Sequence, residues 1–397
     1  ILIPTRNRAS LLKDALDSLV AQDFGDFEVV INDNSSDDET TALVRTFSDA
    51  RIRYAKAPRF LLTHENWNVC YDRAEGEYIL VLGDDDLLLP GTLSQVAAVI
   101  KKKNAKVLSY GIITYFDATY FEARLRNTIH VRSFSGAIVR HDAGKVISDY
   151  FSFRSGLGYP PHPSAMIYHK ATADGLREKC GSFYQTPLGE IIAMPWLLRR
   201  TGAMYVIDKP LAVISRGSSS QVAQEIHEPE KMWKHLDSDF ARTPCKGKYM
   251  YNALAESLLR LQALEPESFG RYRLPMDEYF LLYYQDMMEV ARGGSDVRRD
   301  MEEFWSEFAR LPSAERRSAQ RRLFKIKLKF RARSLLLKLG LFELFRHYIP
   351  HHGAVHVRAS ELGVSSAPGC AAGMVAIGAK LGQPAAIWDS RVEPSNG

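Results

Sequence analysis

The first 110 residues alternate strand and helix patterns, and this alternation limits the folds open to the chain more than any other feature. The segment 78–82 is almost continuously apolar, which is typical of a strand buried on both faces. Apolar strand patterns also occupy 1–3, 27–31 and 106–110, and apolar residues at helical spacing fill 11–20, 40–47 and 93–100. This order predicts an α/β fold with a parallel sheet and right-handed crossovers.

The pattern changes twice along the rest of the chain. Residues 111–220 hold short strands, a Gly/Pro-rich loop and one helix, and amphipathic helices follow beyond 221. After residue 363 the chain is rich in Ala, Gly, Ser and Pro without a clear period. We therefore predict an α/β domain at 1–220, an α-helical extension at 221–350 with a basic amphipathic segment, and a loosely ordered tail at 351–397.

Length and composition exclude several classes of protein. A chain of 397 residues with 46% hydrophobic and 25% charged residues is neither disordered nor fibrous. No apolar run reaches the roughly 18 residues that span a bilayer, so we expect no transmembrane helix. The four cysteines stand far apart without a C-x-x-C pair, which argues against a disulfide framework or a zinc ribbon. We expect a cytoplasmic protein, and a fragment, since the chain opens on Ile1.

Three polar clusters follow three of the predicted strands. They are residues 4–8 (Pro-Thr-Arg-Asn-Arg), 32–38 (Asn-Asp-Asn-Ser-Ser-Asp-Asp) and 83–86 (Gly-Asp-Asp-Asp). Each cluster alone is typical of a solvated turn or a helix cap. Because ligands of parallel sheets bind beyond the carboxyl ends of the strands, three such clusters on one edge predict a binding site.

The chemistry of these clusters favours a nucleotide and a metal. Closely spaced carboxylates hold hard cations such as Mg²⁺ or Mn²⁺, which neutralise the charge of a departing diphosphate. Asp33 is placed to accept hydrogen bonds from a base or ribose, and Arg6 and Arg8 to flank the nucleotide. The chain has neither G-x-G-x-x-G after its first strand nor a P-loop motif, so a nucleotide sugar fits better than a dinucleotide.

In this order, the motifs resemble those of a family 2 inverting glycosyltransferase with a GT-A fold. The resemblance covers roughly residues 1–220 and rests on residues 4–8, 32–37, 76–79 (Gly-Glu-Tyr-Ile) and 84–90 (Asp-Asp-Asp-Leu-Leu-Leu-Pro). It implies a mostly parallel sheet flanked by helices. It also implies inverting transfer of a sugar from a nucleotide-diphosphate donor, a UDP-sugar, to a glycan or lipid-linked acceptor in surface polysaccharide synthesis.

The resemblance assigns roles to individual residues. Pro4 and Arg6 match the motif that lines the uracil pocket, and Asp33 matches the acid that contacts the base. Asp84 matches the position beside the ribose and diphosphate, and Asp85 that of the principal ligand of Mg²⁺ or Mn²⁺. One departure stands in the same motif, since many members have an Asp where this chain has glycine at position 83.

Two further segments resemble parts of the donor site. In residues 65–68, Asn66 matches a polar contact under the nucleotide, whereas Trp67 is expected to pack in the core. In residues 215–218, Arg216 matches the loop that closes over the diphosphate, with a solvated loop arginine as the alternative.

The catalytic base is the least defined of the expected residues. An inverting transfer needs a carboxylate that deprotonates the acceptor hydroxyl, and the family usually places an acidic pair before the last strand. Here residues 187–192 contain Glu190 as the only acid, and a glutamate at a helix start also serves as a partner of the helix dipole. His162 is expected to be a structural loop residue, although it is a candidate to face the acceptor. The histidines at 347, 351, 352 and 356 are expected to be an exposed polar stretch.

The net charge of +5 conceals a strongly basic segment. Residues 315–346 contain eleven basic and two acidic residues, interleaved with large apolar side chains. This profile predicts a segment that contacts an anionic membrane surface, the inner face of a membrane for a cytoplasmic protein. The alternative is a helix packed on the catalytic domain with a solvated basic face. No nucleic-acid-binding motif is present, so no nucleic-acid partner is expected.

A different class of function also fits the sequence. The glycine at 83 and the missing acidic pair are compatible with a non-catalytic GT-A-like module that binds or assembles with other proteins.

Overall fold

The computed structural model describes residues 1–154, 162–218, 220, 233–234, 239–338, 354–383 and 385–388. The chain opens with a three-stranded parallel sheet in the order β1-β2-β3. Its strands are β1 (Leu2–Thr5), β2 (Val29–Asp33) and β3 (Ile52–Lys56), and its helices are α1 (Ala9–Val20), α2 (Glu39–Val44) and α3 (Thr63–Arg73). Pairing of Thr5 with Asp33, and of Asp33 with Lys56, brings the carboxyl ends of the three strands level.

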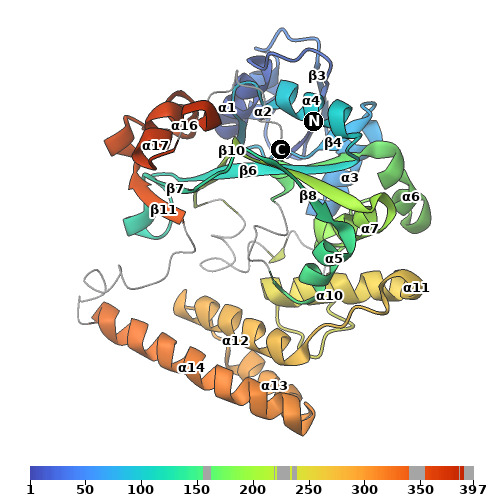
Figure 1. The fold of residues 1–397 in the computed structure, drawn as a ribbon, viewed down its shortest axis with the longest axis vertical. Coiled ribbons are helices and arrows are strands. Elements are labelled where there is room, and N and C mark those ends of the chain that lie inside the picture. The colour runs from blue at the N-terminus through green and yellow to red at the C-terminus, as the bar shows by residue number, and fades with distance from the viewer. Residues whose placement is uncertain are drawn as a thin grey trace.

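A second, eight-stranded sheet forms the centre of the molecule (Figure 1). Its strands are β4 (Tyr78–Leu80), β5 (Leu87–Leu88), β6 (Val107–Phe116), β7 (Thr128–Arg132), β8 (Ile138–Asp142), β9 (Met166–His169), β10 (Ala203–Arg216) and β11 (Ala354–Arg358). The main path runs β11-β7-β6-β10-β5, with β8 on β10 and with β9 between β4 and β6. A parallel bridge between Leu2 and Val81 connects the two sheets.

Helices flank this sheet, as the sequence predicts. They are α4 (Thr92–Lys103), α5 (Ala143–Phe151), α6 (Lys170–Cys180) and α7 (Gly189–Thr201), with 3-10 turns η1 (Ala123–Leu125) and η2 (Pro163–Ala165). The predicted α/β fold is confirmed, and the second sheet is mixed rather than mostly parallel. β10 runs parallel to β6, whereas β6 pairs antiparallel with β7 and β9. The connection from β6 to β7 contains no crossover α-helix, which is why these neighbours run antiparallel.

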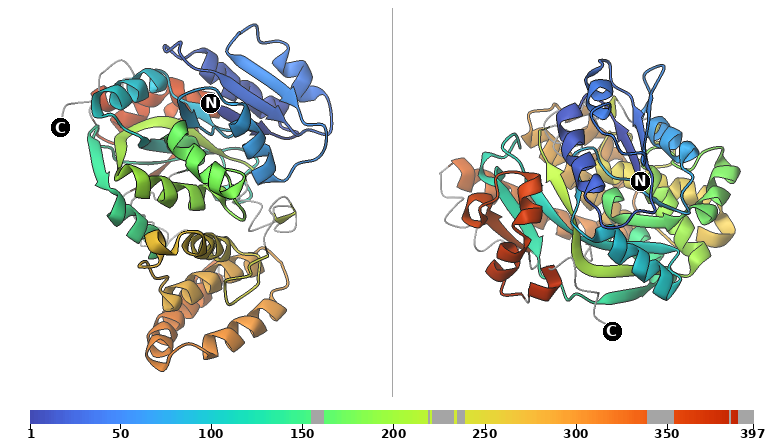
Figure 2. Two further views of the ribbon diagram at one scale, coloured as in Figure 1. Left: turned by 90° about the vertical axis from the view of Figure 1, so that its right-hand side faces the viewer. Right: turned by 90° about the horizontal axis from the view of Figure 1, so that it is seen from above.

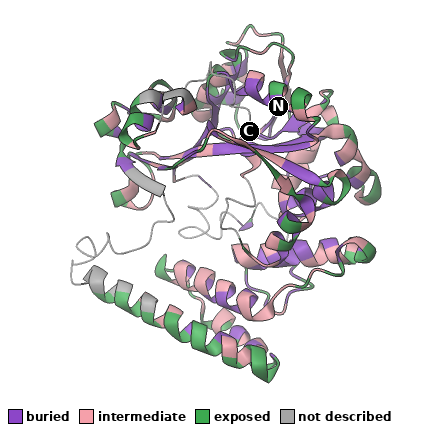
Figure 3. Cartoon of the chain, in the orientation of Figure 1, coloured by how far each residue is buried: buried purple, intermediate pink, exposed green. Residues whose placement is uncertain are grey.

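Periodicity in the sequence explains how the first helix packs. The buried residues of α1 are Leu12, Ala15, Leu16 and Leu19, which recur at spacings of three and four residues and so share one face. This face contacts the core that β1, β2 and α4 complete. Figure 3 shows the same division in the whole domain, with buried residues along the strands and exposed residues on the outer faces of the helices.

The predicted helical extension is present in the described residues beyond 239. Its helices are α10 (Met250–Leu264), α11 (Pro266–Phe269), α12 (Met276–Arg292), α13 (Arg298–Ala309) and α14 (Ser313–Lys338). Figures 1 and 2 show these helices on one side of the α/β domain, where α10 lies between α7 and α12. Among the described helices, none has the length and apolar character needed to cross a membrane.

The described residues of the C-terminal segment differ from the loosely ordered tail that the sequence predicts. Strand β11 pairs antiparallel with β7, and η4 (Ala359–Leu362), α16 (Ala367–Ala372), α17 (Met374–Lys380) and α18 (Ala385–Trp388) follow it. Ile377 and Trp388 are buried in one cluster with Leu87 and Val213 of the sheet. Small residues make this packing close, since a Cβ on Gly378 would lie 2.3 Å from the Trp388 ring. The boundaries at 220 and 350 stay predictions.

We predict that Ile377→Ala lowers the free energy of unfolding by about 2–4 kcal/mol, because it leaves a cavity in this cluster. Ile377 is 1% exposed, whereas Leu335 on α14 is 57% exposed, so Leu335→Ala is a control with little effect. Urea unfolding followed by circular dichroism measures both. Equal unfolding midpoints for Ile377→Ala and the parent chain would show that the segment is not packed on the sheet.

Candidate active site

The loops after β1 and β2 are joined by hydrogen bonds. Asn7 adopts a left-handed backbone conformation with a φ of 53°, which asparagine tolerates better than most residues. Its backbone N–H donates to Ser35 Oγ at 2.7 Å, and its side-chain Oδ1 accepts from the Ser36 N–H at 2.9 Å. The Asn34 N–H also donates to the Thr5 carbonyl at 2.9 Å. The structure therefore brings the first two polar clusters together at one edge of the sheet.

Asp84 ties the third cluster to the first. The Thr5 hydroxyl donates to Asp84 Oδ2 at 2.7 Å, and Arg8 Nη1 donates to Asp84 Oδ1 at 2.9 Å. Burial opposes the Arg8 charge, but Asp84 and Asp85 outweigh this effect and raise the Arg8 pKa. Asp84 thus has a hydrogen-bond partner for each oxygen, one from the last residue of β1 and one from the loop after it.

Asp85 and Asp86 lie beside this contact in different surroundings. Asp86 accepts hydrogen bonds from the Ser164 hydroxyl and, at 3.1 Å, from the Ser215 N–H. Asp85 is 3.5 Å from Arg8 Nη1 in an ion pair. Burial and the neighbouring carboxylate raise the pKa of both acids, since each negative charge disfavours the next one.

Space at Gly83 explains why this chain lacks an aspartate there. A Cβ at this position would lie 2.7 Å from Asp86 Oδ2 and 3.0 Å from Asp85 Oδ1. Asp86 cannot easily yield, because Ser164 and Ser215 hold it from two sides. The glycine therefore permits the two acids to fold back over the end of the strand.

The residues predicted for the base pocket lie at the carboxyl ends of β1 and β2, Pro4 and Asp33 within the strands and Arg6 just after β1. Pro4 pairs with Asn32 in the sheet register, and Asp33 is fully buried. Asp33 accepts from the Ser35 N–H at 2.8 Å and from the Tyr54 hydroxyl at 2.7 Å. Arg6 donates to the Asn34 carbonyl at 2.8 Å.

Phe60 is a member of this edge that the sequence analysis missed. The Arg6 guanidinium lies over its ring, 4.7 Å from the centroid, and the ring is partly exposed. Phe60 follows β3, so the rule that ligands bind beyond the carboxyl ends of parallel strands could have found it.

Asn66 and Trp67 lie behind the loops rather than in them. Asn66 is buried, accepts from Asn32 Nδ2 at 2.7 Å and donates to the Thr5 carbonyl at 3.5 Å. It therefore braces β1 against β2 below the candidate nucleotide site. Trp67 packs edge-on against Tyr184 with ring centroids 5.1 Å apart, so the expected core packing is confirmed.

Arg216 approaches the acidic cluster from β10, the strand that pairs with β5 directly after the three acids. It ends β10, next to Ser215, whose N–H donates to Asp86. Its positive charge lowers the pKa values of Asp85 and Asp86, which burial and mutual repulsion raise more strongly. The structure therefore brings Arg216 within electrostatic range of the acids, whereas sequence alone left a solvated loop residue as the alternative.

His162 adjoins the cluster but behaves as a structural residue. Its Nδ1 accepts from the Ser164 N–H at 3.3 Å and lies 3.7 Å from Asp86 Oδ2. Burial, with a contribution from Arg216, lowers its pKa to about 3, so the ring is neutral at physiological pH. Of the C-terminal histidines, those at 347, 351 and 352 lie outside the described residues.

Glu190 lies in the first turn of α7 and lines a separate cavity of about 240 Å³. The cavity lies between α5, α7 and α10, and its lining contains no residue of the three loops. Burial raises the Glu190 pKa. Tyr184, which contacts Trp67, is close enough to Glu190 for its own pKa to be affected by that charge.

The acidic cluster fits a divalent cation that shares its ligands with a substrate. The described residues contain no group of three or more His, Cys, Asp or Glu side chains arranged to hold a metal by themselves. Asp84 and Asp86 each accept two hydrogen bonds, which leaves Asp85 as the most available carboxylate. One or two carboxylates plus substrate phosphates are the usual ligands of Mg²⁺, so this donor set fits Mg²⁺ or Mn²⁺.

Comparison with known proteins finds a family match for the N-terminal part. Residues 1–157 match the model of "Glycosyl transferase family 2", which confirms the predicted resemblance over this segment. The mixed sheet with flanking helices is GT-A-like.

Curated relatives match a similar part of the chain. It is 38% identical over 97 residues to the GalNAc(5)-diNAcBac-PP-undecaprenol beta-1,3-glucosyltransferase of Campylobacter jejuni, covering 24% of this chain and 31% of that protein. It is 37% identical over 116 residues to a PGL/p-HBAD biosynthesis glycosyltransferase of Mycobacterium bovis, and this match covers 28% of this chain and 44% of that protein. The matched segment thus spans less than half the length of these relatives.

A solved structure of S. aureus TarS 1–349 in complex with UDP-GlcNAc superposes with a TM-score of 0.42 at 18% identity. The superposition covers 74% of this chain and 88% of that one.

Proposed function

Since residues 1–157 match the family 2 glycosyl transferases, we propose that this protein transfers a sugar from a UDP-sugar to a glycan or lipid-linked acceptor in surface polysaccharide synthesis. The observation that carries the proposal is the joining of three loops at the carboxyl edge of a parallel sheet, the acidic loop to the chain at the end of β1 through Asp84 and the loops after β1 and β2 to each other through Asn7. The relatives are named for glycosyl transfer to an undecaprenol-linked glycan and in PGL/p-HBAD biosynthesis, which supports the choice of acceptor.

The donor occupies the edge where the loops meet. Pro4, Arg6 and Asp33 line the base pocket, with Asn66 bracing it from below. Asp84 contacts the ribose and diphosphate, and Arg216 pairs with the diphosphate from the β10 side. Arginine suits this role because its guanidinium matches phosphate oxygens in a planar, bidentate geometry.

Asp85 is the residue that would hold Mg²⁺ or Mn²⁺. When bound, the cation supplies positive charge against the negative charge that develops on the departing nucleoside diphosphate. Arg8 and Arg216 add fixed positive charge on either side of the carboxylates.

Glu190 is the proposed general base of an inverting transfer. Its carboxylate takes the proton of the acceptor hydroxyl while that oxygen bonds to the anomeric carbon of the donor, and the bond to the nucleoside diphosphate breaks on the opposite face. Its place at the start of α7 also fits the alternative role, in which its charge only stabilises the helix dipole. A test therefore has to distinguish a general base from a helix-stabilising charge.

Asp85→Ala should lower donor hydrolysis and sugar transfer by about 100-fold or more, because the diphosphate loses its charge partner. Asp26 is an exposed acid before β2, outside the three loops, and Asp26→Ala is the matched control with near-parental rates. Release of UDP from a panel of UDP-sugars with Mn²⁺ measures the effect. Parental rates in Asp85→Ala would refute the metal-ligand role, and no turnover by any variant or the parent would favour a non-catalytic binding module.

Glu190→Gln should lower kcat by about 100-fold or more with little change in UDP affinity. The base works when deprotonated, and burial raises its pKa above the ordinary value of 4.5, so the rate of the parent should rise with pH to a midpoint above that value. The titratable and charged groups around Glu190 are Asp149 and Arg154 from the α5 side and Tyr251 from α10, which line the same cavity, and Tyr184 before α7, whose pKa is raised by burial and by the Glu190 charge. A pH–rate profile checks this. If the rate of Glu190→Gln falls at low pH with the same midpoint as the rate of the parent, the general base is another group.

We also propose that α14 holds the enzyme at an anionic membrane surface, on the inner face for a cytoplasmic enzyme. Phe324 and Leu328 are 68% and 58% exposed, and Leu335 is exposed as well. At about 100° per residue these three side chains fall within about 40° of one another around the helix. Exposed cations flank this stripe at Arg317, Arg321 and Arg331.

The opposite face of α14 packs within the helical extension. Leu323 and Ala319 are buried in the cluster that includes α12 and α13, and Lys327 lies over the Trp305 ring at 4.3 Å. The exposed stripe therefore faces away from the protein, as an interfacial helix requires.

Phe324→Ser combined with Leu328→Ser should weaken binding to vesicles of 30% anionic lipid by about tenfold or more, since each buried apolar side chain contributes about 1.5–3 kcal/mol. Val20 is an exposed apolar residue of α1, so Val20→Ser is the control. Vesicle sedimentation measures the bound fraction. Equal sedimentation of the double variant and the parent, or equal binding to neutral vesicles, would contradict the proposal.

A further inference from the structure

The cavity beside Glu190 has a mainly apolar lining. Its volume is about 240 Å³, and of the ten lining residues in the described part of the chain seven are aromatic or aliphatic. They are Tyr150 and Phe153 from α5 and the turn after it, Leu188 and Ile191 at the start of α7, and Met250, Tyr251 and Leu254 at the start of α10. The charged members are Asp149, Arg154 and Glu190.

The aromatic wall of the cavity joins two parts of the chain. Phe153 packs edge-on against Tyr251 with ring centroids 6.3 Å apart. Phe153 also has a φ of 53°, a left-handed conformation that is uncommon for a bulky residue. The fold thus holds an unfavourable backbone conformation while it places this ring against α10.

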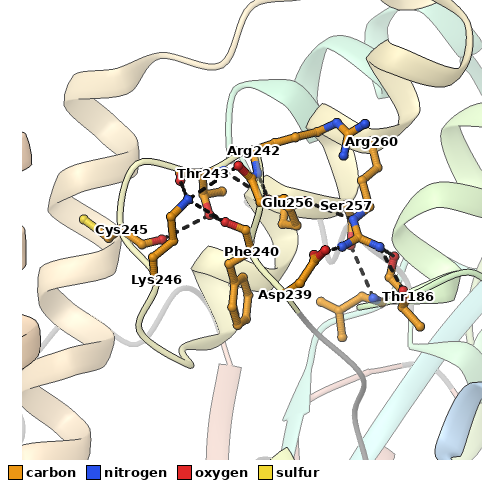
Figure 4. A network of polar contacts seen from close by, with 12 residues as sticks. Thr186, Asp239, Phe240, Arg242, Thr243, Cys245, Lys246, Glu256, Ser257 and Arg260 are labelled. Carbon is orange, nitrogen blue, oxygen red and sulfur yellow. Dashed lines mark hydrogen bonds and ion pairs between the residues drawn. The ribbon is translucent and has the colours of Figure 1, made fainter.

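Contacts from Arg260 fix the α10 wall to the turn that carries Glu190 (Figure 4). Arg260 donates from Nε to Glu256 at 3.0 Å and from Nη1 to Thr186 Oγ1 at 2.9 Å. One helical turn earlier, Ser257 Oγ accepts from the Leu188 N–H at 3.3 Å. The cavity wall and the α7 start therefore form one braced unit.

The same ion pair anchors the segment that precedes α10. Glu256 is fully buried, and its Oε2 accepts from the N–H groups of Arg242 and Thr243 at 2.8 and 3.0 Å. Asp239 pairs with Arg260 from the same segment, as Figure 4 shows. These contacts tie the segment 239–243 to α10, which forms one wall of the cavity.

We propose that this cavity binds an apolar group of the acceptor, a single aromatic ring or a short alkyl or prenyl unit, beside the hydroxyl that Glu190 deprotonates. The inference rests on the proposed function, because that function requires an acceptor. The chemical class of the acceptor group is inferred from the cavity. A cavity of about 150 Å³ lined by Leu, Ile and Phe holds benzene, so 240 Å³ admits a group of this size with room for its link to a sugar.

The test compares phenyl β-D-glucopyranoside with methyl β-D-glucopyranoside, which share the sugar and differ in the apolar group. Saturation-transfer NMR on the full chain detects which protons contact the protein. The variants are Leu254→Arg and Met250→Arg, which place a charge in the cavity wall. Leu259→Arg is the matched control, because Leu259 is a half-buried leucine of α10 outside the cavity lining.

In the parent and in Leu259→Arg we expect strong saturation transfer from the protein to the phenyl protons. Both cavity variants should bind the phenyl glucoside at least about tenfold more weakly. The methyl glucoside should bind weakly to all of them. Circular dichroism identifies the cavity variant that remains folded. Undiminished phenyl signals in a folded cavity variant, or equal binding of the two glucosides, would overturn the inference.

Donor hydrolysis measured on the same samples separates this inference from the proposed function. Hydrolysis by the parent with unselective glucoside binding would reject the cavity's role and leave the transferase in place. Selective phenyl binding without hydrolysis of any UDP-sugar would reject the transferase and the acceptor role with it.

Discussion

The Asp84 carboxylate is the contact on which the arrangement of the site depends. It accepts from the Thr5 hydroxyl and from the Arg8 guanidinium, and so joins the acidic loop to the loop after β1. Asp84 is nearly inaccessible to solvent, so its charge needs these partners. Removal of Arg8 would leave buried negative charge beside two further acids, which is a costly state. The ion pair thus allows three consecutive aspartates to occupy one strand end.

Two sheets divide the work of the α/β domain. The parallel sheet aligns the ends of β1, β2 and β3, and the mixed sheet carries the acids between β4 and β5 and places Arg216 and Ser164 beside them. The helical extension then adds α10 to the cavity that Glu190 lines. The proposed donor site and the proposed acceptor cavity therefore lie in different parts of the structure. The packing of Trp67 on Tyr184 connects these parts.

Local sequence patterns predicted the parts of the fold that local physics determines. The continuous apolar run at 78–82 and the periodic leucines of α1 fixed strands and helices, and strand ends predicted where polar loops would meet. Such patterns do not predict contacts between residues that are far apart in the sequence. The C-terminal segment lacks periodicity, and its order comes from pairing of β11 with β7 and from close packing around Gly378. The brace from Arg260 to Thr186 likewise joins residues 74 positions apart.

The central claim is that the acidic edge binds UDP through a divalent cation. Calorimetric titration of UDP into the full chain, with 5 mM Mn²⁺ or with EDTA, tests it directly. We expect saturable binding at one site with Mn²⁺ and at least about tenfold weaker binding without it. Absence of UDP binding in the presence of Mn²⁺, or equal affinity with EDTA, would contradict it.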